Sequence, residues 1–475
     1  LVAGSSPDLV VNGRTGEIAG VSSGIAGTIL DINNLRNDGT ILATGNAGNG
    51  IAADNVYYLV NSGTIAGGND AIAANYIHTV VNSGTIGQNG GYALEEMGAG
   101  DTTLNLQAGS VLIGNIIIGQ GNDTLIVGPG LNLALDFGAA GDVPETILTA
   151  GAPYYVDAAT GTVYVADVSA FSEALYAPAD LISALGGVVA GALNPAFDEK
   201  GFNGDRRYWV EGIGGGGRGA SDDATGYFGG MVAGLGADID DRTKAGFFLG
   251  ATTGRVETSA GDVTTDSFYA GLYGARQFED FRLEVALTAG YGQSEESRTI
   301  NDNLAVDGLV HAHSAWNSFF LSPSATFRKP FIVNDMAAEG SLRLAYTGIF
   351  SQGFTETGTA APLTVDGATA HVFETRALLS LPREAAAGSG TLKYDLHTGL
   401  EGRAAVNPAD ISGSFGGSAI TVSAASSDLT AGVVAGAGFD YRLAGGARLF
   451  GGVDTVVRSN SGVGLTGSFG VKGTF

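Results

Sequence analysis

The last thirteen residues, 463–475, read Val-Gly-Leu-Thr-Gly-Ser-Phe-Gly-Val-Lys-Gly-Thr-Phe. The even-numbered positions of this segment carry only glycine, serine, threonine and lysine. The large apolar side chains all occupy odd-numbered positions: Val463, Leu465, Phe469, Val471 and Phe475. Successive side chains of a β-strand point to opposite faces, so this segment predicts a long strand with one apolar and one polar face.

The same alternation recurs through the second half of the chain. In residues 391–406 the apolar positions 392, 394, 396 and 400 alternate with ionisable ones, which need water or paired charges around them. Strands this long exceed those of soluble sheets and suit a membrane crossing, where an open sheet edge is not viable. We therefore predict that residues 201–475 form a closed antiparallel transmembrane β-barrel of even strand number. Twelve strands are expected, near 206–219, 225–239, 243–257, 263–278, 280–296, 311–328, 337–353, 369–382, 391–406, 427–443, 446–459 and 461–475.

Composition changes sharply along the chain. Residues 1–168 contain no lysine, two arginines, fifteen acidic side chains and eight aromatic ones, whereas residues 201–475 contain twenty basic side chains and 29 aromatic ones. Such a change marks a domain boundary, and we divide the chain into 1–168, 169–200 and 201–475.

Residues 169–200 read as a helix between the two halves. Ser169 or Ser172 is a candidate N-cap, Pro178 suits the start of a second helical piece, and Asn194-Pro195 is expected to end it. Many small residues would let such a helix pass through a narrow space. Its apolar positions recur at helical spacing: Leu181, Leu185, Val188, Val189 and Ala192.

A short motif repeats in the first half. Val-Asn-Ser-Gly-Thr-Ile occurs at 60–65 and again at 81–86, and a weaker copy spans 36–41. A period of 20–25 residues with one strand per turn predicts a parallel β-helix, a solenoid of roughly seven coils of about 22 residues. We expect asparagine and glycine to supply the bends through positive φ, and 131–135 to form another wall strand.

Composition also limits the classes of function. A net charge of −25 argues against nucleic-acid binding, and the absence of cysteine excludes disulfides and cysteine-ligated metals. No run of 18 apolar residues occurs, so no spanning helix is expected. Residues 1–4 show no export signal, and a secreted protein would carry one upstream.

Three patterns in the first half suggest chemistry. Residues 119–125, Gly-Gln-Gly-Asn-Asp-Thr-Leu, resemble one calcium-binding nonapeptide, but such sites need tandem copies. Residues 20–24 match G-x-S-x-G without a following helix, and His78 has no evident partner for a triad. Four acids could meet on one wall as a glycosidase pair, although solvated corners are the simpler interpretation: Asp54, Asp70, Asp101 and Asp123. We assign no catalytic residue, metal or cofactor.

Taken together, these features resemble the monomeric autotransporters of Gram-negative bacteria. The resemblance rests on the repeated coils, the connecting helix, Arg207-Tyr208-Trp209-Val210-Glu211-Gly212, the glycine-rich segment 229–238, and the terminal Phe475. It implies an all-β protein with a β-helix passenger, a helix in the barrel lumen and a twelve-stranded outer-membrane barrel. It also implies partners: outer-membrane lipid, the barrel assembly machinery and periplasmic chaperones.

The family places its assembly signal in the last strand. Ser468, Gly470 and Phe475 match that signal, whereas Gly473 stands where a large apolar residue is usual. Some relatives cut the passenger at an Asn-Asn pair in the helix. No such pair lies in 169–200, so we expect the passenger to stay attached.

The expected function is display of an acidic passenger at the cell surface for adhesion to a host-surface or neighbouring-cell ligand. Two alternatives remain at this stage. The passenger could be a β-helix enzyme, a polysaccharide lyase, hydrolase or protease. The chain could instead be a porin with a periplasmic domain, which predicts passenger residues that protease cannot reach from outside intact cells.

Overall fold

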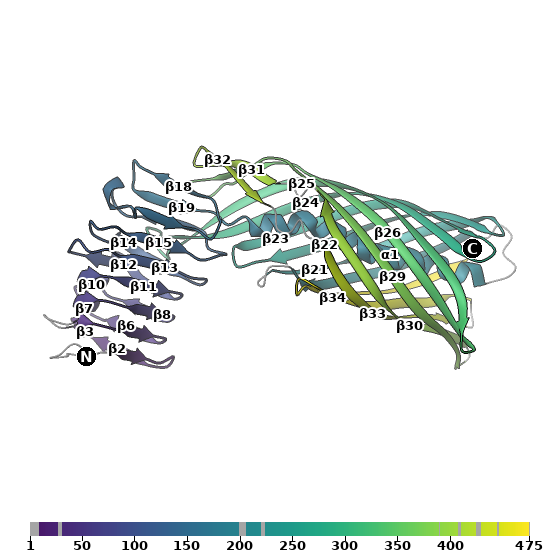
Figure 1. Ribbon diagram of the computed structural model, residues 1–475, viewed down its shortest axis with the longest axis horizontal. Coiled ribbons are helices and arrows are strands. Elements are labelled where there is room, and N and C mark those ends of the chain that lie inside the picture. The colour runs from purple at the N-terminus through teal and green to yellow at the C-terminus, as the bar shows by residue number, and fades with distance from the viewer. Residues whose placement is uncertain are drawn as a thin grey trace.

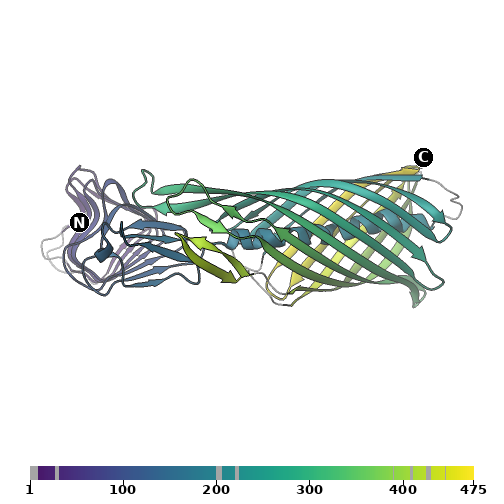
Figure 2. The same ribbon diagram turned by 90° about the horizontal axis from the view of Figure 1, so that it is seen from above.

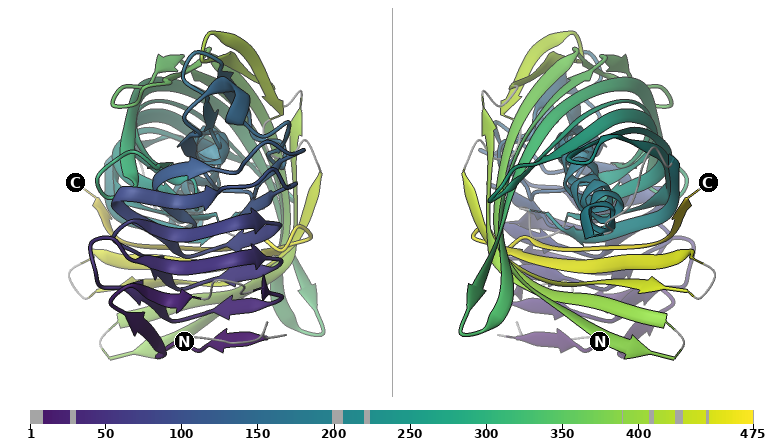
Figure 3. Two further views of the ribbon diagram at one scale, coloured as in Figure 1. Left: turned by 90° about the vertical axis from the view of Figure 1, so that its left-hand side faces the viewer. Right: turned by 90° about the vertical axis from the view of Figure 1, so that its right-hand side faces the viewer.

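The computed structural model describes residues 9–26, 31–198, 206–219, 224–388, 390–406, 410–423, 429–443 and 446–474. A solenoid lies beyond one end of a β-barrel, and its coils stack across the long axis of the barrel (Figure 1). Viewed from above, one helix runs along the inside of the barrel (Figure 2). The end views show the same helix enclosed by the barrel strands (Figure 3).

The solenoid has about six turns of parallel strands, one fewer than expected. One sheet contains β1 (Val10–Asn12), β5 (Leu35–Asn37), β8 (Leu59–Asn61), β11 (Thr79–Asn82), β13 (Thr103–Leu106), β15 (Thr124–Val127) and β17 (Thr146–Leu148). The other contains β2 (Glu17–Gly20), β3 (Ser23–Ala26), β4 (Asp31–Ile32), β6 (Thr40–Ala43), β7 (Asn49–Val56), β9 (Thr64–Ala66), β10 (Asp70–Ile77), β12 (Thr85–Glu96) and β14 (Val111–Ile117).

Buried aliphatic side chains stack from coil to coil inside the solenoid. Leu35, Leu59, Val80, Leu104 and Leu125 occupy equivalent register positions, and each is almost fully buried. Each coil alone would leave its apolar residues in water, so the coils are stable only as a stack.

The repeated asparagines form a ladder at one corner of the solenoid. The amide of Asn12 donates to Asn37 Oδ1 at 2.7 Å, Asn37 to Asn61 at 2.7 Å, and Asn61 to Asn82 at 2.8 Å. The ladder ends where Asn82 donates to Ser110 Oγ at 2.7 Å. Each asparagine is buried, so every rung satisfies a polar group that would otherwise be costly to bury.

The expected positive φ at this motif is wrong. None of the repeat asparagines adopts it, and neither do Gly63 and Gly84. The glycines are instead required by close stacking, because a Cβ on Gly63 would lie 2.0 Å from the Gly39 carbonyl oxygen and one on Gly84 would lie 2.1 Å from that of Gly63.

The segment after the coils joins the solenoid to the barrel. Residues 131–135, expected as a solenoid wall, instead lead into an antiparallel sheet. Strand β16 (Leu133–Asp136) also pairs in parallel with barrel strand β24 (Arg282–Asp302), through Leu133 and Asn301. The edge of β24 thus replaces a further coil as the pairing partner. The elements are β16 (Leu133–Asp136), the 3₁₀ helix η1 (Ala140–Asp142), β18 (Tyr154–Asp157) and β19 (Thr162–Val165).

Twelve antiparallel strands form the barrel, which closes because β24 pairs with β25. The predicted number of strands is confirmed, and most ends agree within a few residues; β24 and β25 are longer than expected. The strands are β20 (Arg206–Arg218), β21 (Thr225–Asp240), β22 (Thr243–Glu257), β23 (Gly261–Gln277), β24 (Arg282–Asp302), β25 (Leu309–Val333), β26 (Met336–Ser351), β29 (Ala368–Ala387), β30 (Gly390–Val406), β33 (Thr430–Arg442), β34 (Arg448–Arg458) and β35 (Val463–Thr474).

The barrel has an apolar outside and a polar inside. In β30, Leu396 and Leu400 point outward and are 61% and 65% exposed, whereas the next residue, Glu401, points inward and is buried. Leu465 and Phe469 of β35 are likewise exposed on the outside. The alternation seen in the sequence therefore corresponds to the two faces of the barrel wall.

Four further strands form a separate antiparallel sheet at the solenoid end of the barrel, called here the loop sheet (Figure 1). Its strands come from the connections between barrel strands. They are β27 (Phe354–Thr355), β28 (Leu363–Val365), β31 (Asp410–Phe415) and β32 (Ser418–Ser423).

One continuous helix, α1 (Ser169–Asp198), replaces the two helical pieces expected. It passes Pro178 and continues beyond Asn194-Pro195, so the expected stop is wrong. Neither expected serine is shown to cap it; the Ser169 amide instead donates to Asp167 Oδ1 at 2.8 Å. By length and composition alone, Ser169–Leu193 could cross a membrane, contrary to the sequence expectation, but α1 lies inside the barrel.

The asparagine ladder can be tested in the full-length protein. Asn61→Ala leaves the amide of Asn37 and the carbonyl of Asn82 without their neighbouring rung, and should destabilise the solenoid by about 1–3 kcal/mol. Ser62→Ala, at the exposed neighbouring position, is the matched control and should cost less than about 0.5 kcal/mol. Urea-dependent proteolysis of the solenoid measures both, and equal effects would contradict the ladder.

Candidate functional site: the helix-filled lumen

The apolar face of α1 packs against one side of the barrel wall. Leu181, Leu185, Val188 and Val189 are buried, and Ala192 packs against the same apolar cluster at partial burial. All five predicted lumen residues therefore lie on the packed side of the helix. The wall contributes aromatic side chains to this cluster: Trp209, Phe248, Tyr269 and Tyr273.

Glycines on neighbouring strands make room for these rings. A Cβ on Gly234 would lie 2.4 Å from the Trp209 ring, and one on Gly271 would lie 2.3 Å from that of Phe248. The indole Nε1 of Trp209 donates to the Tyr273 hydroxyl at 3.1 Å, so its polar atom is satisfied inside the wall. The glycine-rich barrel segment thus has a packing role.

The small-residue face of α1 meets the charged side of the lumen. Arg343 donates to the Ile182 carbonyl oxygen at 3.0 Å, and Lys472 donates to that of Gly191 at 2.8 Å. Arg376 donates to Ser183 Oγ at 3.1 Å. These bonds use backbone and hydroxyl acceptors of the helix, so the wall holds α1 between residues 182 and 191.

The lumen charges are paired with one another. Arg343 lies 2.6 Å from Glu374, and Arg376 lies 2.6 Å from Glu401 and 3.1 Å from Asp454. Further pairs link His397 with Asp395 and Asp454, Arg458 with Glu401, and Lys472 with Asp440. Pairing offsets the desolvation that would otherwise make a charged face unfavourable here.

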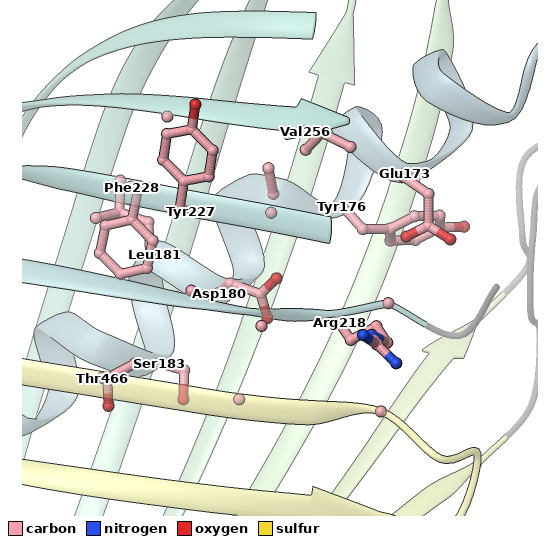
Figure 4. Close-up of a pocket in the computed structure, with 18 of the residues that line it drawn as sticks. Glu173, Tyr176, Asp180, Leu181, Ser183, Arg218, Tyr227, Phe228, Val256 and Thr466 are labelled. Atoms are coloured by element: carbon pink, nitrogen blue, oxygen red, sulfur yellow. The ribbon is translucent and has the colours of Figure 1, made fainter. Parts of the chain in front are cut away.

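Among the described residues, the two larger cavities beside the helix lie toward its opposite ends. One of about 250 Å³ lies near the solenoid end, surrounded by Glu173 and Asp180 of α1 and Arg218 of β20 (Figure 4). A second of about 820 Å³ lies along the other half of the helix. Both include Ser183 and Arg376 in their lining. The remaining space is far too small for a folded solenoid coil.

The predicted assembly signal lies on the strand that closes against β20. Ser468 pairs with Ile213 and Gly470 with Glu211, and a Cβ on Gly470 would lie 2.5 Å from the Val210 carbonyl oxygen. At Gly473, where a large apolar residue is usual, the end of the Tyr208 side chain occupies the adjacent space, and a Cβ there would lie 2.7 Å from its hydroxyl oxygen. Phe475 lies outside the described residues.

Comparison with known proteins agrees with this geometry. The profile of the family described as "Autotransporter beta-domain" matches residues 208–454, more than half of the chain. The chain is an autotransporter. A search of curated proteins finds no match.

A solved translocator domain has the same barrel fold. The autotransporter resembles the translocator domain of NalP from Neisseria meningitidis with a TM-score of 0.50 and 20% identity, over 65% of this chain and 99% of that one. The β domain of Bordetella BrkA matches with a TM-score of 0.44 and 14% identity, over 58% and 100% of the two chains. The transport unit of AIDA-I from Escherichia coli matches at 0.39 and 11%, over 57% and 90%.

In the passenger of this autotransporter, the acidic side chains considered as a catalytic pair bind neighbouring groups of the solenoid itself. Asp123 accepts from the Thr102 amide at 2.7 Å and Asp101 from that of Asn122 at 2.8 Å. Within the described ranges, no group of three or more histidine and acidic side chains is arranged to hold a metal ion. These carboxylates cap backbone amides.

The other candidate patterns also have structural partners. Residues 20–24 run from β2 into β3 with no helix, so the elbow that a G-x-S-x-G nucleophile needs is missing there. His78 stacks on Tyr57 with ring centroids 4.7 Å apart. Asp54 accepts from the Asn75 amide at 2.5 Å, and Asp70 from that of Asn69 at 2.7 Å.

The burial of Asp70 predicts that the folding stability of the passenger depends on pH. Burial, reinforced by the neighbouring Glu95, raises the pKa of this carboxyl from 3.8 to about 6. The folded passenger therefore binds the proton more tightly than the unfolded chain, and this stabilisation is lost as the pH rises from 3.8 through about 6. Asp70→Asn should flatten that loss and make the passenger more stable than wild type at neutral pH. Urea-dependent proteolysis at several pH values measures it, with Asp54→Asn as the control; an unchanged slope would contradict the assignment.

Two adjacent glycines test the contact between α1 and the wall. A Cβ on Gly186 would lie 2.5 Å from Arg343 Cζ, whereas one on Gly187 meets nothing within 4 Å. Gly186→Ala should displace the guanidinium and cost about 1–3 kcal/mol. Gly187→Ala should be neutral or stabilise the helix by up to about 1 kcal/mol. The temperature at which the barrel unfolds in detergent distinguishes them, and identical shifts would show that Arg343 does not clasp the helix.

Proposed function

We propose that the barrel carries its own acidic β-helix across the outer membrane and holds it at the cell surface for adhesion or another surface contact. The observation that supports this most is the path of α1. The helix starts beside the solenoid and runs through the lumen to the other end of the barrel, where β20 begins (Figures 1 and 2). One chain thus connects the two sides of the membrane through its own pore.

Folding outside the cell would draw the chain outward. Each coil that joins the stack buries aliphatic residues and adds a rung such as the bond between Asn61 and Asn82. A chain threaded through the barrel can form neither contact, because the lumen has no room for a coil. The exterior folded state is therefore favoured at every step.

The passenger presents regular, acidic faces. It has fifteen acidic side chains against two arginines in residues 1–168. The carboxylates that suggested catalysis accept hydrogen bonds from the passenger's own amides, for example at Asp101 and Asp123. This supports a contact surface for a host or neighbouring-cell ligand in preference to a polysaccharide-cleaving or proteolytic site.

Insertion is proposed to depend on the last strand. Ser468, Gly470 and Phe475 carry the signal for the barrel assembly machinery, after delivery by periplasmic chaperones. The division into a passenger at 1–168, a lumen helix at 169–200 and a barrel at 201–475 belongs to the same proposal. The passenger stays attached, since 169–200 contains no Asn-Asn pair.

Protease shaving of intact cells tests this function. Protease added outside should release peptides from residues 9–168, whereas the untreated protein should run as one chain that contains both the solenoid and the barrel. Deletion of Phe475 should abolish both the folded barrel and the released peptides, because the assembly signal is incomplete. Passenger peptides that stay protected in intact cells, or normal display by the truncated chain, would refute the proposal.

A further inference from the structure

A buried ion pair joins the loop sheet to the barrel wall. Arg298 of β24 donates to Glu356, which follows β27, through Nε at 2.7 Å and Nη2 at 2.6 Å. Both side chains are only 2% exposed. Glu356 Oε2 also accepts from the Leu363 amide of β28 at 2.9 Å, so the pair fixes the turn that connects these two strands.

The same arginine reaches the segment that precedes the helix. Arg298 Nη1 donates to Asn132 Oδ1 at 2.9 Å, and that oxygen also accepts from the Asp167 amide at 2.8 Å. The Asn132 amide donates to the carbonyl oxygens of Ala260 and Thr299, at 2.7 Å and 3.2 Å. Asn132 is buried, and its donors and its acceptor are both engaged.

Asp167 continues the network into α1. Its Oδ1 accepts from the Ser169 amide at 2.8 Å, and its Oδ2 accepts from the Gly130 amide at 2.8 Å. Arg298, Glu356, Asn132 and Asp167, called here the Arg298 lock, therefore join the loop sheet, the barrel wall, the junction and the first turn of the helix.

An aromatic cluster lies where these elements meet. Phe171 of the first helical turn packs edge-on against Trp316 of β25 at 5.1 Å and against Phe354 of β27 at 5.3 Å. Trp316 and Phe354 stack at 4.9 Å. Phe171 is 1% exposed, so this side of the outer mouth is closed around the helix.

We infer that the Arg298 lock assembles only when export is complete, and that Arg298 is the positioning residue that fixes the finished passenger and closes this side of the outer mouth. The inference rests on the proposed function, since Asn132 and Asp167 lie in the exported part of the chain while Arg298 and Glu356 belong to the barrel. Until Asn132 arrives, one guanidinium donor lacks its acceptor, and a buried unmatched donor is unfavourable. Arrival of the last exported residues thus completes the network.

The absence of native cysteine allows a direct test in the full-length protein on cells. Ser172→Cys places a single thiol in the first helical turn, where the serine is 4% exposed. In this background Arg298→Met should make labelling by a membrane-impermeant maleimide at least about tenfold faster, because the mouth opens. Arg298→Lys, which keeps the charge but not the fork of donors, should give an intermediate rate.

Arg255→Met is the matched control, since Arg255 also pairs with carboxylates on the outer end of a strand but is 41% exposed. The barrel should show the same heat-modifiable migration on a gel in both variants. A change in labelling rate then reports on the Arg298 lock and not on a loss of barrel stability. Labelling in Arg298→Met within about twofold of the Arg255→Met rate would overturn the inference. If Arg298→Met yields no folded barrel, the labelling rate of Glu356→Gln is compared with that of Arg255→Met instead, and the same twofold limit applies. Protease shaving of these cells reports separately on passenger display.

Discussion

Closure of the sheet between β24 and β25 is the constraint on which the rest of the structure depends. In a lipid bilayer every backbone amide and carbonyl must be satisfied within the protein, and a ring of antiparallel strands does this without an open edge. Once the ring closes, the outward positions meet lipid and the inward positions meet each other. The paired charges and the helix are therefore consequences of filling the inside of a closed ring.

The helix in the lumen makes two different kinds of contact with the barrel wall. Its apolar side covers the aromatic wall around Trp209 and Phe248, which would otherwise face water. Its small side lets Arg343 and Lys472 approach the backbone and satisfy carbonyl groups at Ile182 and Gly191. A helix with large residues all round could make the first contact but would exclude the second.

Much of the architecture was predictable from local patterns. Two-residue alternation located the barrel strands, because it depends only on neighbouring residues, and the repeats located the coils. Contacts between distant residues left no such trace. Arg298 and Glu356 are 58 residues apart, and neither lies in a motif, so their pairing could not be anticipated. The same holds for the loop sheet and for the pairing of β16 with β24. The repeat asparagines were recognised but given a turn role, because burial was not visible in the sequence.

The ladder of asparagines has a consequence for how such proteins can vary. Each rung bonds only to the rung before and after it, and each coil presents the same edge as its neighbour. Duplication or loss of a whole coil would therefore change the length of the solenoid while leaving its attachment to the barrel untouched. Length can diversify in steps of one coil without any redesign of the membrane-embedded part.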